Sequence, residues 1–337
     1  MSDTADQAPV PAPAGAQAFT FGEPTPVLDS RGILDYAECW QNGRYYEPPV
    51  SLSGLARTTR SNPTLQSGLL FKRNMLSLTF KPHPLLSRER FNQLALDWIT
   101  FGTAYVERRN SVTGAPLEML VPLAQYVRRG VVPGEFFQVR GHREEHAFKP
   151  GSIFQLRDAD VDQEIYGMPE WLSAVQSALL NESATLFRRR YYNNGSHAGF
   201  ILYLSDANVN DGDVDAMRQA LKDSKGVGNF RNLFLHSPGG QKDGIKLIPI
   251  SEVAAKDEFS GIKNVTRDDM LTALRVQPQL LGIVAQNSGG FGDIGKAAQV
   301  WAAMELAPLQ ARMTAINEWL GMDVIRFNPF TVGTAGT

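Results

Sequence analysis

The stretch 165–204 constrains the fold more than any other part of this chain. After Pro169, some 23 residues run without Gly or Pro as far as Asn193-Asn194-Gly195, and an apolar run follows at once. Proline in the first turn and Asn-Gly just beyond the last turn are typical of helix ends. At 1.5 Å per residue, a helix over 169–193 is roughly 35 Å long. We therefore expect a long helix that leads directly into a strand.

The two sides of this expected helix differ in chemistry. At 100° per residue, its large apolar side chains fall within about 120° of one another: Trp171, Leu172, Val175, Ala178, Leu179 and Leu186. The opposite side carries small and polar residues together with one cation: Ser173, Ser177, Asn181, Ala184 and Arg188. A helix with one apolar stripe and such a back face is expected to pack against other helices rather than inside a globule.

Composition and charge narrow the functional classes. The chain has 337 residues, 43% of them hydrophobic, which allows one large domain or two to three smaller ones. A formal charge of −2 gives no basic excess, so sequence-specific DNA binding is not suggested, although DNA can pass nearby without being gripped. The single cysteine, Cys39, rules out an internal disulfide and a CxxC metal site, and we read it as a small apolar residue.

The apolar runs and the first residues of the sequence show whether a membrane span or a signal peptide is expected. No apolar run approaches the length that spans a bilayer, so no membrane association is expected. The first residues are acidic and rich in Pro and Ala, without the apolar core of a signal peptide. We expect residues 1–17 to form a disordered arm.

The segment between the arm and the long helix mixes both periodicities. A helix is expected to restart after Pro63, and a second one is expected over about 87–101 with Ser87 as its cap. From 102 to 156 the apolar period changes to two, with Gly and Pro turns between short runs, which predicts a β-rich block.

The second half of the chain repeats the alternation of long helices and short strands. We expect the strands GFILYL, NLFLH and IKLIPI with a helix at about 210–224 among them, then a second long helix at about 252–275. A last long helix is expected at about 293–320, kinked by Pro308, and a closing strand in DVIRFNPF.

The helix expected over 252–275 presents three faces. Lys256, Lys263 and Arg267 lie within about 40° of each other. An apolar stripe lies beside them: Phe259, Ile262, Thr266, Met270 and Ala273. Acidic residues occupy the far side: Asp257, Glu258, Asp268 and Asp269. This pattern fits either a surface helix with many salt bridges or a helix wedged among neighbours with a different partner on each side.

One basic cluster, Arg188-Arg189-Arg190, stands near the C-terminal end of the first long helix. Cations at that position interact favourably with the helix dipole. Alternatively they contact an acidic face on a neighbouring subunit, for which the four acidic residues of the second long helix are candidates. The two interpretations are compatible.

Two motifs suggest chemistry, but neither has the expected context. Gly290-Phe-Gly292-Asp-Ile-Gly295 matches the dinucleotide pattern G-x-G-x-x-G, yet only about 40 residues follow it, too few for the rest of a doubly wound sheet. His142-Arg-Glu-Glu-His146 matches H-x-x-E-H, which binds zinc from one helix face. Here it stands between an apolar alternating run and a Lys-Pro-Gly turn, so a charged hairpin tip is expected. The sequence therefore predicts no enzyme, no metal site and no cofactor.

Several of these segments resemble the portal proteins of tailed bacteriophages, in particular the PBSX-type portals of temperate, contractile-tailed phages. The resemblance is carried by the YG-x-P sequence at 166–169, the long helix that ends in arginines, the Tyr-Tyr-Asn-Asn-Gly stop at 191–195 and the strand after it. The Pro-Gln-Leu-Leu-Gly sequence at 278–282 and the glycine-rich loop ahead of GKAAQVWAAMEL also match. The resemblance covers about residues 30 to 330.

The resemblance implies an α+β portal fold with parts in a fixed order. These are a mixed α/β wing at 18–168, a first stem helix at 169–193, a clip at 194–251, a second stem helix at 252–276, a tunnel loop at 277–292, and a kinked wing helix with a final strand at 293–337. Little sequence follows the wing helix, so the crown of larger portals is expected to be vestigial or missing.

The function implied is a ring, of twelve subunits in the virion, at one capsid vertex through which viral DNA is packaged and ejected. The implied partners are the terminase large subunit, the major capsid protein and scaffold, head-completion or neck proteins, and double-stranded DNA without sequence specificity. Assembly is expected in the bacterial host cytoplasm.

The resemblance also assigns roles to residues. The tunnel loop touches passing DNA through Gln286, Asn287, Ser288, Gly289, Gly290 and Phe291. Lys256, Lys263 and Arg267 face the channel or a neighbouring subunit. Two alternatives remain: a nucleotide-dependent enzyme that uses the glycine loop 289–295, and a self-assembling scaffold unrelated to phages.

Overall fold

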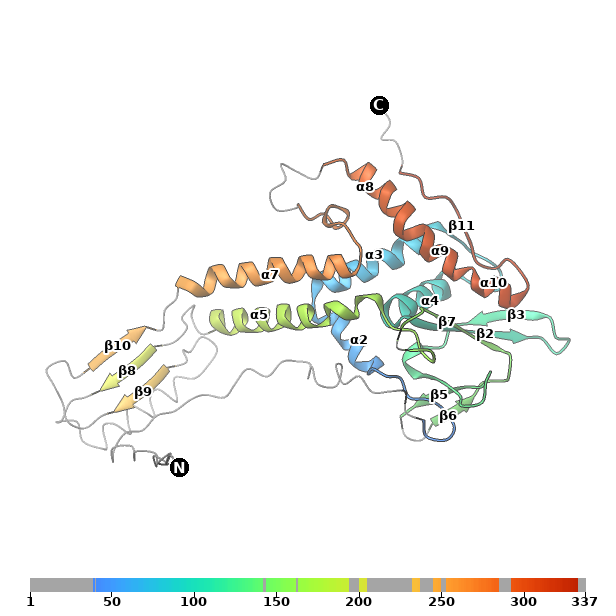
Figure 1. The fold of residues 1–337 in the computed structure, drawn as a ribbon, viewed down its shortest axis with the longest axis horizontal. Helices are drawn as coiled ribbons and strands as arrows, with labels where there is room; N and C mark the ends of the chain where they lie inside the picture. Colours follow the sequence, from blue (N-terminus) through green and yellow to red (C-terminus); the bar gives the residue numbers. More distant parts are fainter. Residues whose placement is uncertain are drawn as a thin grey trace, which may run out of the picture. The chain divides into compact units, whose positions relative to one another are not determined.

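The computed structural model describes residues 39, 41–141, 144–161, 163–193, 200–204, 232–236, 245–249, 253–284 and 292–332. The chain divides into two compact units: Ser183–Lys263 belongs to the smaller, while Val27–Glu182 and Asn264–Thr337 form the larger. Runs of helices and runs of mostly antiparallel strands follow one another along the chain, as expected for the predicted α+β class (Figure 1). The expected arm at 1–17, the expected helix at 210–224 and the loop residues Gln286 to Phe291 lie outside the described residues.

Three helices open the larger unit. They are α2 (Leu52–Ser61), α3 (Pro63–Thr79) and α4 (Arg88–Phe101). The Asn62 side chain accepts hydrogen bonds from the amides of Thr64 and Leu65, and Pro63 occupies the first turn, where its missing N–H costs nothing. The Ser87 hydroxyl accepts from the Arg90 amide. The predicted starts of both helices are therefore confirmed.

Two three-stranded sheets follow. In the first, β2 (Thr103–Asn110) pairs with β3 (Pro116–Leu120) and β7 (Ile153–Arg157) in the order β3-β2-β7. In the second, β5 (Phe136–Arg140) lies between β4 (Val127–Arg129) and β6 (Glu144–Ala147), with the short turn η1 (Ala124–Tyr126) ahead of β4. All of these pairs are antiparallel.

Strand β6 corrects one expectation. Glu145 and His146 lie within β6 and pair with β5, where the sequence predicted the tip of a hairpin. The expected hairpin is present, but its second strand begins at Glu144, so the last residues of the motif lie in that strand rather than at the tip. His142 lies outside the described residues.

The larger unit buries two apolar clusters. One joins α2, α3 and the second sheet to Trp171, Val175 and Leu179, and the other joins α4 and the first sheet to the C-terminal helices. In the second cluster the rings of Phe80 and Phe91 stack at a centroid distance of 3.9 Å. Phe80 begins β1 (Phe80–Lys81), which pairs with β11 (Arg326–Phe327), so the predicted closing strand is confirmed.

The two predicted long helices are present. The first begins as a 3-10 turn, η2 (Glu170–Ala174), and continues as α5 (Val175–Asn193), while the second is α7 (Val253–Ala273). The predicted apolar stripe of α5 is buried or half-buried, but so are Asn181 and Ala184 from its expected back face. Asn181 is buried because its amide donates a hydrogen bond to Thr266, a partner that the sequence pattern does not show.

The strands of the smaller unit form one mixed sheet. Its strands β8 (Phe200–Leu204), β9 (Asn232–His236) and β10 (Ile245–Pro249) follow the order β10-β8-β9. β8 pairs with β10 in antiparallel fashion and with β9 in parallel. All three strands occupy the runs that the sequence predicted.

The last helices follow one another in line (Figure 1). After the turn η3 (Pro278–Leu281) come α8 (Ile294–Trp301), the π-helical turn η4 (Ala302–Leu306), α9 (Ala307–Met313) and α10 (Ala315–Leu320). Pro308 has no N–H for the Met304 carbonyl, and its ring crowds that carbonyl. The irregularity expected at Pro308 is thus present, as a widened π turn just ahead of it.

Candidate functional site

The YG-x-P sequence forms a tight junction at the start of the first long helix. A Cβ on Gly167 would overlap the carbonyl of Gly102, so only glycine fits at this contact. Gly102 ends α4 in the left-handed conformation at φ 69°. Its carbonyl also accepts a hydrogen bond of 2.8 Å from the Asp158 amide. The junction therefore ties the end of α4 to the end of β7 and to the helix start.

Two aromatic side chains secure the same junction. The Tyr166 hydroxyl donates to the Tyr46 carbonyl at 2.5 Å and accepts from the Arg129 amide at 3.0 Å. Burial raises the pKa of Tyr166 above its usual range, so the hydroxyl stays protonated. The indole Nε1 of Trp171 donates to the Thr100 carbonyl at 3.1 Å. These bonds satisfy buried polar groups that would otherwise cost stability.

A cluster of charged side chains surrounds Glu170, the first residue of η2. Its carboxylate lies 3.3 Å from Lys72, 2.8 Å from Arg275 and 3.2 Å from Arg312. Burial opposes the ionisation of Glu170, but the three cations outweigh it and hold its pKa below the usual value. Glu170 thus connects α3, the end of α7 and α9.

Two further carboxylates complete this cluster. Glu305, in the π turn, lies 2.6 Å from Lys72 and 3.6 Å from Arg275. Asp158 pairs with Arg312 at 2.9 Å, but burial raises its pKa to about 6. We call these six residues the charge cluster: Lys72, Asp158, Glu170, Arg275, Glu305 and Arg312.

The backbone at Arg275, a member of the charge cluster, adopts an uncommon conformation. Arg275 has a positive φ of 55° just after α7, and its carbonyl accepts from the Trp301 indole at 3.0 Å. Sequence reasoning missed the cluster, because its members come from five separate segments. One signal was available, since Lys72 falls at helical spacing between the apolar residues Leu69 and Leu76.

The described side chains of α5 and α7 meet through polar contacts in the larger unit. The Ser177 hydroxyl donates to Asp269 at 2.8 Å, and the Asn181 amide donates to Thr266 at 2.6 Å. Asp268 pairs with the adjacent Arg267 at 2.9 Å. Both described members of the predicted acidic face are therefore exposed but already have partners in their own chain.

The predicted basic residues are only partly described. Arg188 and Arg189 are exposed, and Lys263 and Arg267 are half-buried. Burial lowers the pKa of Lys263, and the nearby Arg188 lowers it further, so these two cations lie close enough to repel. The remaining predicted side chains lie outside the described ones: Arg190, Lys256, Asp257 and Glu258.

The two ends of the predicted tunnel loop are well defined. On one side, η3 ends at Gly282 with φ 72°, and the Ile283 amide returns to the Pro278 carbonyl at 3.0 Å. On the other side, the Asp293 side chain caps α8 by accepting from the Lys296 amide at 2.9 Å. The described chain ahead of Gly292 is a 3-10 turn, not the strand that a dinucleotide loop follows.

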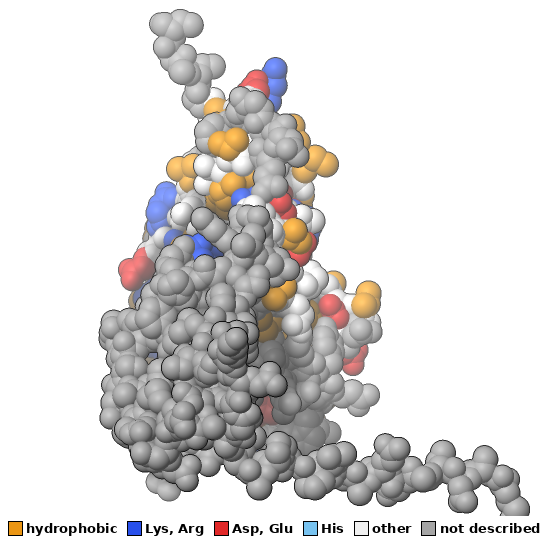
Figure 2. Space-filling model, turned by 90° about the vertical axis from the view of Figure 1, so that its left-hand side faces the viewer, with side chains coloured by type: hydrophobic (Ala, Val, Ile, Leu, Met, Phe, Trp, Pro, Cys, Tyr) orange, Lys and Arg blue, Asp and Glu red, His pale blue; other side chains and the backbone are white. Residues whose placement is uncertain are grey.

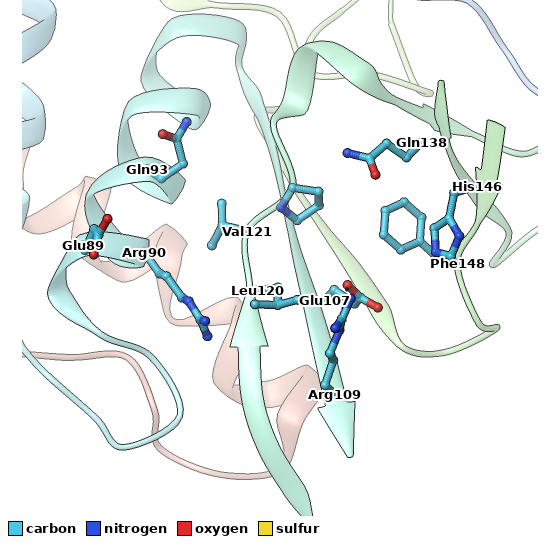
Figure 3. Close-up of a pocket in the computed structure, with 11 residues that line it drawn as sticks. Glu89, Arg90, Gln93, Glu107, Arg109, Leu120, Val121, Gln138, His146 and Phe148 are labelled. Atoms are coloured by element: carbon cyan, nitrogen blue, oxygen red, sulfur yellow. Dashed lines mark ion pairs between the residues drawn. The ribbon is translucent and has the colours of Figure 1, made fainter. Parts of the chain in front are cut away.

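A groove of about 440 Å³ lies between α4, the first sheet and the β5–β6 hairpin (Figure 3). His146 and Phe148 line one side of it, while Arg90 and Arg109 line another. Arg90 pairs with Glu118 at 2.9 Å, and Arg109 lies 3.6 Å from Glu107. Because both arginines of this lining have acidic partners, the groove is poorly suited to a phosphate.

Within the described residues, no helix is long and apolar enough to cross a bilayer.

Relatives of known family cover nearly the whole chain. The model of the phage portal protein family matches residues 70–331. A probable portal protein of Escherichia phage P2 is 51% identical over 318 residues, which are 94% of this chain and 92% of the relative. A probable portal protein of Haemophilus phage HP1 is 37% identical over 309 residues, with 89% and 88% covered.

Solved structures share the fold at lower identity. A chain from the virion of a native gene transfer agent particle has a TM-score of 0.61 and 18% identity, covering 85% of this chain and 86% of that one. A chain from the neck of the native particle, computed with C12 symmetry, has the same TM-score and identity with 86% of each covered. An HK97 family phage portal protein from Corynebacterium diphtheriae has a TM-score of 0.58 and 14% identity, with 81% and 94% covered. The chain therefore has the α+β portal fold and belongs to the phage portal protein family.

Proposed function

We propose that this chain forms the portal ring at one capsid vertex of a tailed phage, through which viral DNA is packaged and later ejected. The observation that carries this proposal is the 51% identity with a probable portal protein over 94% of the chain. A ring of twelve copies is supported by the C12 symmetry of the neck that contains a chain of the same fold. The mechanism is geometric: repeated heterologous contacts close a ring around a channel.

The parts of the ring follow the order of elements along the chain. The wing comprises 18–168, the stem helices 169–193 and 252–276, and the clip 194–251. The tunnel loop comprises 277–292, and the wing helix with the final strand 293–337. The charge cluster then joins residues of the wing, the start of the first stem helix and the wing helix.

Contacts between subunits are proposed to involve the stem helices. The exposed Arg188 and Arg189 and the adjacent Arg190 meet acidic residues of the next copy near the junction of stem and clip. The acidic candidates are Asp257, Glu258, Asp268 and Asp269. Carboxylates of the next copy would compensate these exposed cations, by about 0–1 kcal/mol for each pair.

The channel surface is proposed to hold DNA weakly. Lys256, Lys263 and Arg267 form a basic stripe on the channel side or between subunits, and Arg267 is already paired with Asp268, which weakens its attraction for phosphate. The loop Gln286, Asn287, Ser288, Gly289, Gly290 and Phe291 has no lysine or arginine. Weak phosphate contacts let a duplex slide, whereas strong ones would stall it.

The remaining partners follow from a place at the vertex of the virion. The clip docks the terminase large subunit during packaging and head-completion or neck proteins afterwards. The wing contacts the major capsid protein and scaffold during assembly in the host cytoplasm. This role requires neither a cofactor nor catalysis by the chain itself.

The size of the purified full-length chain tests the proposal. Light scattering should give several hundred kilodaltons, as twelve copies of a 37.1 kDa chain require, and negative-stain images should show rings with a central channel. Rings of neighbouring symmetry agree with the proposal. A stable monomer at micromolar concentration and moderate salt would overturn it.

A further inference from the structure

The outward face of the wing helix is apolar and carries no exposed charge between Gln299 and Ala311. Met304 is 74% exposed and Val300 is 49% exposed, and the two side chains lie one helical turn apart, so they form a contiguous apolar surface. Smaller apolar residues extend this surface along two rows at i, i+4 spacing. We call the whole set the wing-helix stripe: Val300, Ala303, Met304, Ala307, Pro308 and Ala311.

The opposite face of the same helix is buried within its own subunit. Trp301, Leu306 and Leu309 are buried in the apolar core, and Glu305 is held by Lys72 at 2.6 Å. The helix therefore cannot roll to bury the wing-helix stripe without breaking a buried ion pair and opening the core. The π turn lies in the middle of the stripe, as such turns commonly do at functional surfaces.

The space-filling view agrees with an apolar surface at this end of the molecule. Figure 2 shows hydrophobic side chains gathered over the upper part of one face, where α8 lies, with single basic and acidic groups at the tip. Lys296 and Asp293, which cap α8, account for charges at this end of the helix.

The chemistry of the stripe decides which occupant it suits. DNA is excluded as an occupant because a nucleic acid surface is recognised through lysine and arginine, and this surface has neither. The core of a protein–protein interface is, by contrast, depleted of charge and rich in residues such as methionine.

We propose that the wing-helix stripe packs against a second copy of this chain. This inference rests on the proposed ring, because a ring places a neighbouring copy beside every subunit, as in the C12 neck that contains a chain of the same fold. In a ring of more than two copies, the stripe meets a different surface of the next copy, so one apolar patch in each chain is covered at every interface. The charge cluster contributes indirectly to this contact. Its Lys72–Glu305 pair holds the buried side of the helix in the core and so keeps the stripe facing outward.

Assembly of the full-length chain with Met304→Lys tests the proposal. A lysine at this position would have to be buried uncompensated in the interface, so the concentration at which rings form should rise at least about tenfold, which corresponds to about 1.4 kcal/mol. Val112→Lys is the matched control, because Val112 is also apolar and fully exposed but lies outside the stripe. It should leave assembly unchanged. Equal ring formation by the two folded variants would overturn the proposal.

A second measurement does not depend on the stability of the Met304→Lys variant. In a Cys39→Ser background, a single cysteine at position 304 or at position 112 is labelled with a maleimide in assembled rings. Met304→Cys should react at least about tenfold more slowly than Val112→Cys, although both positions are exposed in the single chain. Similar labelling rates would show that the stripe is uncovered in the ring and would sink the inference. If the unsubstituted chain forms no ring at all, it is the proposed function that fails.

Discussion

The Nζ of Lys72 lies 2.6 Å from the Oε1 of Glu305, and only 2% and 7% of the two side chains are exposed. This pair joins α3 to the π turn across most of the sequence. A buried ion pair is costly to break, because removal of one partner leaves the other charge uncompensated inside the protein. The pair therefore ties the C-terminal helices to α3.

We expect Lys72→Met to lower the free energy of unfolding by about 3–5 kcal/mol, because it leaves the buried Glu305 carboxylate with only the more distant Arg275 and also removes a cation from Glu170. The double variant Lys72→Met with Glu305→Leu should recover most of this loss, since it removes both charges. Thermal unfolding measures both effects. Arg44→Ala is the control, because the Arg44–Glu145 pair is exposed and contributes only about 0–1 kcal/mol. Equal losses from Lys72→Met and Arg44→Ala would contradict the prediction.

Gly167→Ala should destabilise the protein by about 3 kcal/mol or more, because the added Cβ would overlap the Gly102 carbonyl and neither backbone segment can move easily. Gly261→Ala is the matched control within α7. No atom lies within 4 Å of its added Cβ, so alanine should stabilise the helix by about 0.5–1 kcal/mol. Thermal melting of both variants tests this difference, and a harmless Gly167→Ala would disprove the tight junction.

Asp97→Asn should change how stability depends on pH. Burial raises the pKa of Asp97 to about 6, although the Ala124 amide and Gln93 donate hydrogen bonds to its carboxylate. The folded state therefore holds a proton more tightly than the unfolded state, so this group's contribution to stability falls as pH rises from about 4 to about 6. Between these two pH values, the contribution of Asp97 to the free energy of unfolding changes by at most about 3 kcal/mol.

Melting temperatures of the wild type and Asp97→Asn across this range measure that contribution. The variant should gain stability relative to the wild type as the pH rises, because asparagine can retain the bond from Ala124 without a charge. Asp158, with a similarly raised pKa, is present in both proteins and cancels in the comparison. If the melting temperatures of the two proteins changed in parallel with pH, Asp97 would not contribute to the pH dependence of stability.

Replacing Arg188, Arg189 and Arg190 with alanine should weaken ring assembly at low salt and make it less dependent on salt, because the variant has lost the ion pairs that salt screens. Each exposed pair contributes only about 0–1 kcal/mol, but the ring repeats it at every interface. Arg57→Ala with Arg60→Ala removes two exposed arginines of α2 and serves as the control. Light scattering across a salt series measures the effect, and unchanged assembly of the triple variant would count against the inter-subunit role.

Deleting Ser288 to Gly290 should leave the ring intact but impair the packaging or retention of DNA. The described ends of the loop, at Gly282 and Asp293, are fixed by their own hydrogen bonds and do not need its middle. Electron microscopy of the rings and counts of filled heads in complemented infections test this separately. Loss of the ring itself, or heads that fill and hold DNA normally, would show that the tunnel-loop assignment is wrong.

The sequence by itself determined the local elements. The start of α3 at Pro63, the Ser87 cap of α4 and the long helices α5 and α7 were all predictable. These features depend on residues within one or two turns of each other, where periodicity and capping operate. The order of these elements along the chain was also enough to suggest the portal family.

The tertiary structure decided what joins these elements. Gly167 must be glycine because Gly102 approaches it, and Asn181 is buried because Thr266 accepts its hydrogen bond. In the charge cluster, Arg312 pairs with Asp158 although 154 residues separate them. Periodicity carries no information about such distant partners, because each contact exists only once the chain has brought separate segments together and excluded water from between them.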